Sequence, residues 1–373
     1  MQGMGLYIHV PFCMGKCPYC DFYSQTPAPG QTAAYTQALL RGLRHLPPQA
    51  AGRPLDTVYF GGGTPNLLGA DNLCTLLEEV GNVFALAPDA EITTEANPGS
   101  ITAQDLLQLR RGGFNRLSLG LQSSHPAELA LLGRRHTPND VKDAVKAARK
   151  AGFENISLDL MLGTPGQTVK SALQSVDFCA DLGVEHISAY LLKVEPGTPY
   201  AKANMEEQIP DGDGMAERYL AVCEHLERRG YDQYEISNYA REGLISRHNT
   251  SYWLGTDYIG LGPAAHSLWQ GQRYCFPRDL QGFVQAENPF DLWQQDGEGG
   301  SREEYVMLRL RLTQGLDLKE LEAGWPGAAE ENEYLRRQIP PLVKAGLAKL
   351  EGERLSLTRE GFLVSNGIIS RLI

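Results

Sequence analysis

Short runs of apolar and β-branched residues alternate with longer amphipathic runs from the N-terminus to about residue 235. A period of two predicts strands, and a period near 3.6 predicts helices. Six strand–helix pairs follow one another, which is typical of a parallel sheet with crossover helices. The expected strands span residues 6–12, 56–62, 91–98, 116–123, 155–163 and 186–194, and the expected helices span 32–46, 72–84, 103–112, 139–151, 169–182 and 213–229.

Glycine closes three of these helices, in the stretches KAGF, DLGV and RRGY. A glycine at this position adopts the left-handed conformation that ends a helix before the next strand. The repeated order of strand, helix and glycine predicts an α/β fold, a (β/α)₆ partial TIM barrel. An open doubly wound sheet is the alternative arrangement of the same elements.

The alternation stops after about residue 235, so we predict three parts: a barrel over residues 1–240, a linking segment over 241–300, and a smaller α+β domain over 301–373. In the last part the order of helices and a hairpin is similar to a winged helix. This part holds eleven Lys or Arg and eleven Asp or Glu, so it has no net positive charge with which to attract DNA. We expect it to pack against the barrel or to dock a partner.

Composition narrows the class of protein. The net charge of −11 disfavours a nucleic-acid partner, and no apolar run approaches the roughly 20 residues of a membrane span. The chain starts without a recognisable signal peptide, so we expect a cytoplasmic location and no direct membrane insertion. An odd number of cysteines, seven, argues for metal or catalytic use of any cluster. The isolated cysteines are expected to be small packed side chains: Cys74, Cys179, Cys223 and Cys275.

Cys13, Cys17 and Cys20 form a C-x₃-C-x₂-C cluster directly after the first expected strand. A structural zinc site needs four protein ligands, and His9 is the one nearby candidate for the fourth. A [4Fe–4S] cluster fits the three thiols better, because three thiolates leave one iron open to a substrate or cofactor. The missing fourth cysteine therefore predicts an open iron site.

Polar or glycine residues also fall at the ends of the other expected strands, where barrel enzymes place their chemistry. These residues are expected to meet the cysteines at one mouth: Gly61, Gly62, Gly63, Thr64, Glu95, Gln122 and Asp159.

CMGKCPYCDF together with YFGGGTP resembles the radical S-adenosylmethionine (SAM) superfamily. The resemblance implies a [4Fe–4S] cluster on the three cysteines, whose open iron binds the methionine part of SAM. It further implies that Gly61 to Gly63 meet the methionine amino group, although a plain tight turn is the alternative for the glycines. Thr64, directly after them, is expected among the SAM-binding residues. Asp159 resembles the residue that binds the ribose hydroxyls.

Three further SAM contacts follow from the same resemblance. Arg134 resembles the arginine that pairs with the SAM carboxylate, with Arg135 as the alternative. Glu95 and Gln122 offer hydrogen bonds to SAM. Tyr7, near the start of the first strand, is expected over the cluster or SAM, or else in the core.

The linear order of YIHVPFC, GGGTP, EANPGSIT, RLSLGLQS, LGRRH and DLMLGTPGQ resembles the oxygen-independent coproporphyrinogen III oxidase group over nearly the whole chain. That group has an oxidase branch and a HemW-type haem chaperone branch. The oxidases resemble C-x₃-C-x₂-C-x-C, whereas here Phe22 takes the place of the fourth cysteine. HNTSYW, residues 248–253, matches the HNxxYW motif of the chaperone branch.

The resemblance therefore implies a haem chaperone that passes haem to apo-haemoproteins such as respiratory enzymes, with cluster and SAM bound and an electron donor as partner. His248, within an aromatic-rich loop, is the candidate haem ligand, and His266 is a second. The alternatives are a SAM-dependent coproporphyrinogen III dehydrogenase-like oxidoreductase and a radical SAM enzyme with an unrelated substrate.

Overall fold

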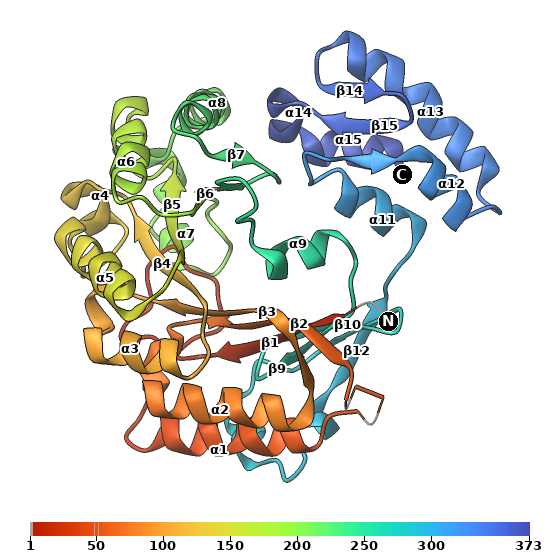
Figure 1. Ribbon diagram of the computed structural model, residues 1–373. Helices are drawn as coiled ribbons and strands as arrows, with labels where there is room; N and C mark the ends of the chain where they lie inside the picture. The colour runs from red at the N-terminus through yellow and green to blue at the C-terminus, as the bar shows by residue number, and fades with distance from the viewer. Residues whose placement is uncertain (1–2, 48, 51) are drawn as a thin grey trace.

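Six parallel strands lie side by side in the order of the sequence in the computed structural model, which describes residues 3–47, 49–50 and 52–373 (Figure 1). Neighbouring strands pair in parallel, for example Tyr7 of the first with Tyr59 of the second. This order confirms the α/β partial barrel. The strands are β1 (Met4–Val10), β2 (Pro54–Gly62), β3 (Ala85–Ala96), β4 (Arg116–Gln122), β5 (Asn155–Leu162) and β6 (His186–Leu191).

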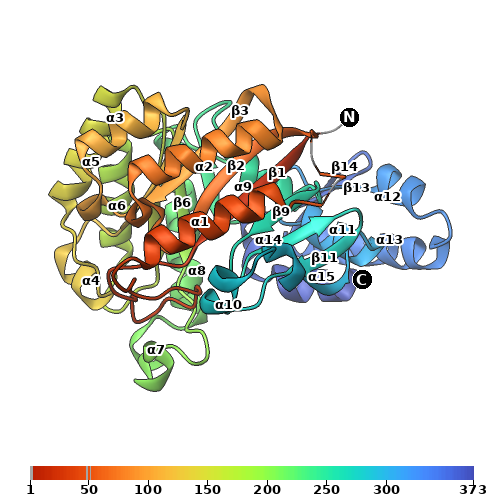
Figure 2. The ribbon, with the colours of Figure 1, turned by 90° about the horizontal axis from the view of Figure 1, so that it is seen from below.

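Helices cover the outside of this sheet and bury one apolar face each (Figure 2). Thr102, Thr137 and Thr168 begin three of them, each accepting a hydrogen bond from a backbone N–H in the first turn. Gly152 and Gly183 have φ angles of 96° and 67°, the left-handed endings that the sequence predicts. The main helices are α1 (Gln31–Arg44), α2 (Ala70–Val83), α3 (Ala103–Arg111), α5 (Pro138–Ala151), α6 (Val169–Asp181) and α8 (Gly212–Arg228).

Short elements that the hydrophobic pattern does not reveal connect these strands and helices. Most contain four residues or fewer, too short for a periodic signal. They are η1 (Pro65–Leu68), η2 (Pro98–Ser100), α4 (Pro126–Leu131), α7 (Pro199–Lys202), η3 (Met205–Gln208), β7 (Asp232–Gln233) and β8 (Asn238–Ala240).

The segment expected to link two domains extends the sheet instead. The strand β9 runs parallel to β1, and three antiparallel strands continue from it. At the other edge β8 and β7 follow β6, so the main sheet of the described residues has 12 strands. The segment contains α9 (Arg247–Trp253), β9 (Tyr258–Leu261), β10 (His266–Trp269), β11 (Gln272–Cys275), α10 (Leu280–Gln285), η4 (Pro289–Leu292) and β12 (Gln294–Glu298).

The C-terminal part has the winged-helix-like order of helices and a hairpin, with a small antiparallel sheet in the order β13-β15-β14. Its elements are α11 (Arg302–Arg309), β13 (Leu316–Asp317), α12 (Leu318–Gly324), α13 (Ala329–Lys344), β14 (Ala348–Glu351), β15 (Arg354–Leu357), α14 (Arg359–Leu363) and α15 (Ser365–Leu372). The Ile236 N–H donates to Arg311 O at 3.0 Å, which ties this part to the barrel. It lies at the end of the molecule opposite the red loop that follows β1 (Figures 1 and 2).

None of the helices formed by the described residues is both long enough and apolar enough to span a membrane.

Candidate functional site

A cavity of about 510 Å³ opens where the parallel strands end, a size within the usual range for small-molecule sites. Residues from the loop after β1 and from the ends of β2 to β6 line it together. The structure thus gathers most of the side chains that the sequence singles out: Cys13, Cys17, Cys20, Gly62, Gly63, Thr64, Glu95, Gln122, Arg134 and Asp159.

The three cysteines are free thiols on the loop after β1. Two of their sulfur atoms already accept hydrogen bonds: Thr64 Oγ1 donates to Cys13 Sγ at 3.5 Å, and Arg134 Nη1 donates to Cys17 Sγ at 3.7 Å. Burial raises the pKa of the Cys20 thiol. Donors aimed at sulfur stabilise thiolates and tune an iron–sulfur cluster. The thiols and their neighbours therefore fit a [4Fe–4S] cluster.

His9 does not complete a four-ligand zinc site with these cysteines. The ring is 5 % exposed, and its Nδ1 and Nε2 atoms lie 2.9 Å from the Tyr7 hydroxyl and from Tyr23 O respectively. Burial lowers the pKa of His9 to about 4. Both ring nitrogens of His9 thus have partners inside the protein, so His9 is not available as the fourth ligand of a zinc ion.

The glycine motif after β2 packs directly against the chain that leads into Cys13. Gly63 N–H donates to Val10 O at 2.9 Å, and Thr64 N–H donates to Phe12 O at 2.7 Å. A Cβ atom on Gly63 would lie 2.5 Å from Phe12 O, closer than real contacts allow. Glycine is therefore required there to hold the cysteine loop against the barrel.

Two half-buried carboxyl groups face the cavity. Glu95 accepts hydrogen bonds from the Tyr59 hydroxyl at 2.7 Å and from Gly62 N–H at 3.1 Å, and burial raises its pKa to about 7. Asp159 accepts from the Ser118 hydroxyl at 3.2 Å, and burial raises its pKa as well. Both groups offer oxygens that accept hydrogen bonds from hydroxyl or amino groups of a ligand.

Arg134 lies inside the cavity, whereas its neighbour Arg135 is exposed. Arg134 Nη2 donates to Asn97 Oδ1 at 2.6 Å and to Gly120 O at 2.9 Å, so the guanidinium is held between β3 and β4. Gln122, on the same strand end, has a φ of 68°, a strained conformation that is common at functional sites. Of the two arginines, Arg134 is the one placed to meet a ligand carboxylate.

Tyr7 is absent from the described residues that line the cavity. It lies within β1, where its hydroxyl bonds His9 and its ring centroid is 6.2 Å from that of Tyr59. Burial raises its pKa well above the ordinary value. In this arrangement Tyr7 supports the barrel interior, the core position that the sequence left open.

The HNTSYW stretch is helical, so the expectation that His248 sits in a loop is wrong. His248 belongs to α9 and is 1 % exposed. Its Nδ1 lies 2.8 Å from Thr57 Oγ1 and its Nε2 lies 2.7 Å from the Tyr252 hydroxyl, while burial lowers its pKa to about 3. Both ring nitrogens are therefore occupied within the protein.

Sequence reasoning missed several residues that line the cavity, among them Asn97, Arg116 and Asn249. Asn97 follows Glu95 at the end of β3, so the rule that found Glu95 could have found it. Arg116 begins β4, is 2 % exposed and has no described hydrogen-bond partner at Nε. Nothing in its local sequence separates it from a surface arginine.

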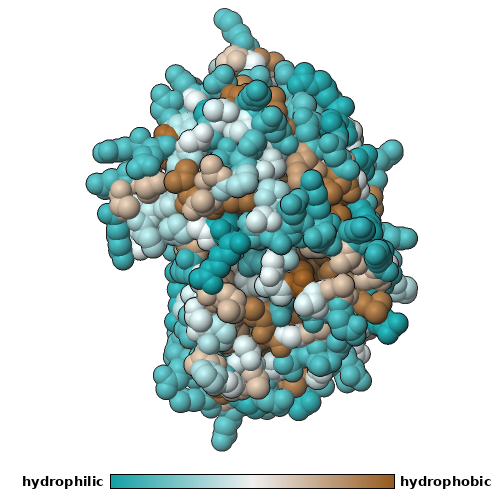
Figure 3. Space-filling model, turned by 90° about the vertical axis from the view of Figure 1, so that its left-hand side faces the viewer, coloured by the Kyte–Doolittle hydropathy of each residue, from teal (hydrophilic) through white to brown (hydrophobic). Residues whose placement is uncertain are grey.

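Exposed apolar side chains border the mouth of the cavity. Phe22, Tyr190 and Leu191 line the cavity, and Met14 is exposed beside the cysteines. Figure 3, which views the molecule from the left-hand side of Figure 1, shows hydrophobic side chains around a hollow in a mostly hydrophilic surface. This rim offers an apolar contact surface next to the cysteine loop.

Two family models match the chain. The Radical SAM superfamily model matches residues 7–179, and the HemN C-terminal domain model matches residues 302–364. The cysteine triad and the polar strand ends lie within the first match. Fold and site thus define a radical SAM protein, which carries a [4Fe–4S] cluster and SAM.

Full-length relatives narrow the class. The heme chaperone HemW of Mycobacterium tuberculosis (strain ATCC 25618 / H37Rv) is 39 % identical, covering 100 % of this chain and 95 % of its own. Those of Escherichia coli (strain K12) and Bacillus subtilis (strain 168) are 35 % and 33 % identical, each covering 98 % of this chain and 97 % and 98 % of their own. The chain therefore belongs to the HemW family of radical SAM proteins.

The solved structure of the coproporphyrinogen III oxidase HemN from Escherichia coli has the same fold, with a TM-score of 0.85. It is 23 % identical and covers 99 % of this chain and 90 % of its own. At this identity the similarity establishes the fold alone.

Proposed function

We propose that the protein is a haem chaperone, which binds haem and transfers it to apo-haemoproteins. The observation that carries this proposal is the full-length similarity to heme chaperone HemW proteins, which includes the C-terminal domain. Phe22 supports it, because a 65 % exposed aromatic side chain stands where the oxidase pattern has a fourth cysteine. The cluster, when bound, supplies electrons and an open iron for SAM.

The apolar rim around the mouth is the proposed contact surface for haem. Haem is flat and largely apolar, so it gains free energy by covering Met14, Phe22, Tyr190 and Leu191. A haem held at this rim stays accessible to a recipient, as transfer requires. We propose respiratory enzymes as recipients and a separate electron donor for the cluster. The free thiols at all seven cysteines suit a reducing cytoplasm.

A ligand role for His248 requires α9 to leave its buried position. The hydrogen bonds to Thr57 and Tyr252 must break before either ring nitrogen reaches iron. His266 has a 60 % exposed side chain and needs no such opening. Haem ligation by His248 therefore requires a local opening of α9, whereas ligation by His266 does not.

An anaerobic absorbance titration of haem into cluster-loaded protein tests this function. Wild type is expected to show saturable binding with a shifted Soret band. Loss of that shift in His248→Ala, but not in Tyr252→Phe, would identify His248 as the ligand, because Tyr252→Phe frees Nε2 and keeps the imidazole. Loss in His266→Ala alone would identify His266.

Absence of saturable haem binding in wild type would overturn the chaperone proposal. Turnover of coproporphyrinogen III with SAM and a reductant would then be the assay that supports the oxidase instead.

A further inference from the structure

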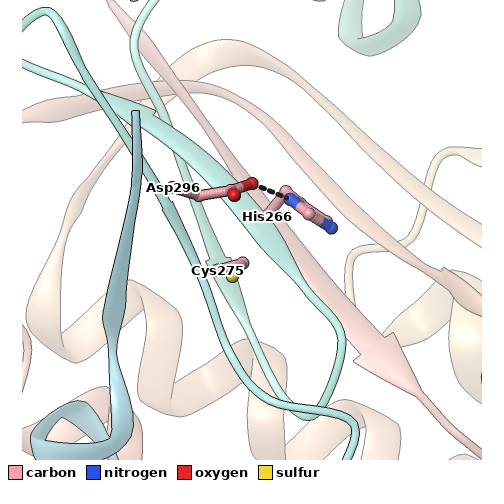
Figure 4. Close-up of side chains that lie close together, drawn as sticks. All are labelled: His266, Cys275 and Asp296. Carbon is pink, nitrogen blue, oxygen red and sulfur yellow. Dashed lines mark ion pairs between the residues drawn. The ribbon is translucent and has the colours of Figure 1, made fainter. Parts of the chain in front are cut away.

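Three side chains with metal-binding chemistry come together on the antiparallel extension of the sheet, outside the cavity (Figure 4). His266 is the first residue of β10, Cys275 is the last residue of β11, and Asp296 lies in β12. His266 and Cys275 are direct cross-strand partners. One ligand atom from each residue lies within 4.8 Å of the other two.

The spacing of these atoms suits a small cation. His266 Nδ1 and Asp296 Oδ2 are 3.3 Å apart. Tetrahedral zinc, with ligand bonds of about 2.0 to 2.3 Å, places its ligand atoms roughly 3.3 to 3.6 Å from one another. The side chains of His266 and Asp296 are 60 % and 51 % exposed, so small rotations that close the remaining gap to the Cys275 sulfur meet little resistance.

The donor set selects the kind of metal. Thiolate and imidazole favour zinc and its transition-metal neighbours over calcium or magnesium, which prefer oxygen ligands. A haem iron offers one axial position on each face, so three donors that converge from one side do not match it. Three protein ligands leave a fourth position open for water or another ligand.

We propose that His266, Cys275 and Asp296 bind a divalent ion of the zinc class, with one coordination position open. On binding, the Cys275 thiol loses its proton to solvent and its sulfur bonds the metal, with no change of oxidation state. The expectation that Cys275 is only a packed small side chain is replaced by this role. The proposal does not depend on haem binding.

The site lies beside the cysteine loop. Arg278, three residues after Cys275, pairs with Asp21 at 3.6 Å, and the Leu280 N–H donates to the Tyr23 hydroxyl at 3.0 Å. These contacts tie the strand extension to the segment that carries Cys20. The three proposed ligands themselves are not among the described residues that line the cavity, so the site is separate from the cysteine cluster.

Zinc binding to the full chain with its cluster loaded tests the proposal, because the cluster then occupies Cys13, Cys17 and Cys20. Anaerobic equilibrium dialysis against zinc chloride, with zinc and iron measured by mass spectrometry, is expected to show one zinc per chain. Cys275→Ser and His266→Ala should each weaken binding at least ten-fold. Cys74→Ser and His45→Ala, a half-buried cysteine and an exposed histidine elsewhere, should match wild type.

No saturable zinc in wild type, or equal affinity in the two site variants and the two controls, would overturn the site. X-ray absorption of the wild-type zinc complex gives a second readout that needs no variant. One sulfur with nitrogen and oxygen neighbours is expected, whereas three sulfurs would assign the zinc to the cluster cysteines and refute the proposal. Haem titration of wild type and Cys275→Ser tests the chaperone function separately, because Cys275 is not a candidate haem ligand.

Discussion

At the scale of single residues, Arg134 joins the cysteine loop to the strand ends. Its guanidinium contacts the Cys17 sulfur, Asn97 and Gly120, and it faces the cavity. A fork of donors can bind a carboxylate at two points, which a lysine ammonium cannot do.

We predict that Arg134→Lys weakens SAM binding about ten-fold, the effect of losing roughly 1.4 kcal/mol, the size of one charge-assisted hydrogen bond. Calorimetric titration of SAM into cluster-loaded protein measures this. The exposed neighbour provides the matched control, Arg135→Lys, which should bind SAM like wild type. Equal affinities in all three proteins would count against a role for Arg134.

Glu95 makes the stability of the protein depend on pH. Its pKa is raised to about 7 in the folded state from 4.5, so the protonated form is favoured by folding. The stability that this group contributes is complete below pH 4.5 and is lost as the pH rises through 7.

We therefore predict that wild type loses about 2 kcal/mol relative to Glu95→Gln between pH 5 and pH 8, because glutamine cannot ionise. Urea unfolding of both cluster-free proteins at the two pH values measures the difference. Asp159 and Glu235, whose pKa values are also raised, are present in both proteins. A difference independent of pH would show that Glu95 does not titrate in this range.

At the scale of elements, α9 is held by a carboxylate from β3. Glu91 accepts hydrogen bonds from the N–H groups of Arg247 and His248 at 2.9 and 3.0 Å, at the positive end of the helix. This buried contact fixes the HNTSYW stretch beneath the cavity, where Asn249 reaches the lining.

We predict that Glu91→Ala costs about 2 to 4 kcal/mol of unfolding free energy, because it leaves two N–H groups near the barrel interior without their charged acceptor. Urea unfolding measures the loss. Asp89→Ala is the control, since Asp89 also pairs with Arg247 but is 81 % exposed, and it should change stability by less than about 1 kcal/mol. A similar loss of unfolding free energy in both variants would contradict the role of Glu91 in holding α9.

At the scale of the whole molecule, charge decides what the winged-helix-like part can bind. The chain carries a net charge of −11, and its last 73 residues are electrically balanced by formal charge. The net negative charge of the full chain repels a phosphate backbone, and the C-terminal part has no net positive charge that would attract one.

We predict no saturable binding of a duplex DNA to the full chain at physiological salt, as measured by fluorescence anisotropy. Binding that saturates and weakens steeply with added salt would contradict this prediction, because it would indicate a local basic surface that the net charge does not show.

The sequence by itself determined what depends on local pattern. Strand and helix periodicity, with glycines 152 and 183 at helix ends, defined the six barrel units. The spacing of Cys13, Cys17 and Cys20 defined the loop chemistry, because ligands close in the chain need no fold to bring them together. Polar residues at strand ends predicted the cavity, since parallel strands end at one edge.

Only the tertiary structure decided what depends on distant partners. His248 is buried because Thr57 and Glu91, far away in the sequence, satisfy its polar groups, so a motif with the composition of a loop became an internal helix. His266, Cys275 and Asp296 meet because their strands are neighbours, which their spacing along the chain does not reveal. Burial and cross-strand pairing depend on how distant segments pack in the folded sheet, so the local sequence around each residue does not reveal them.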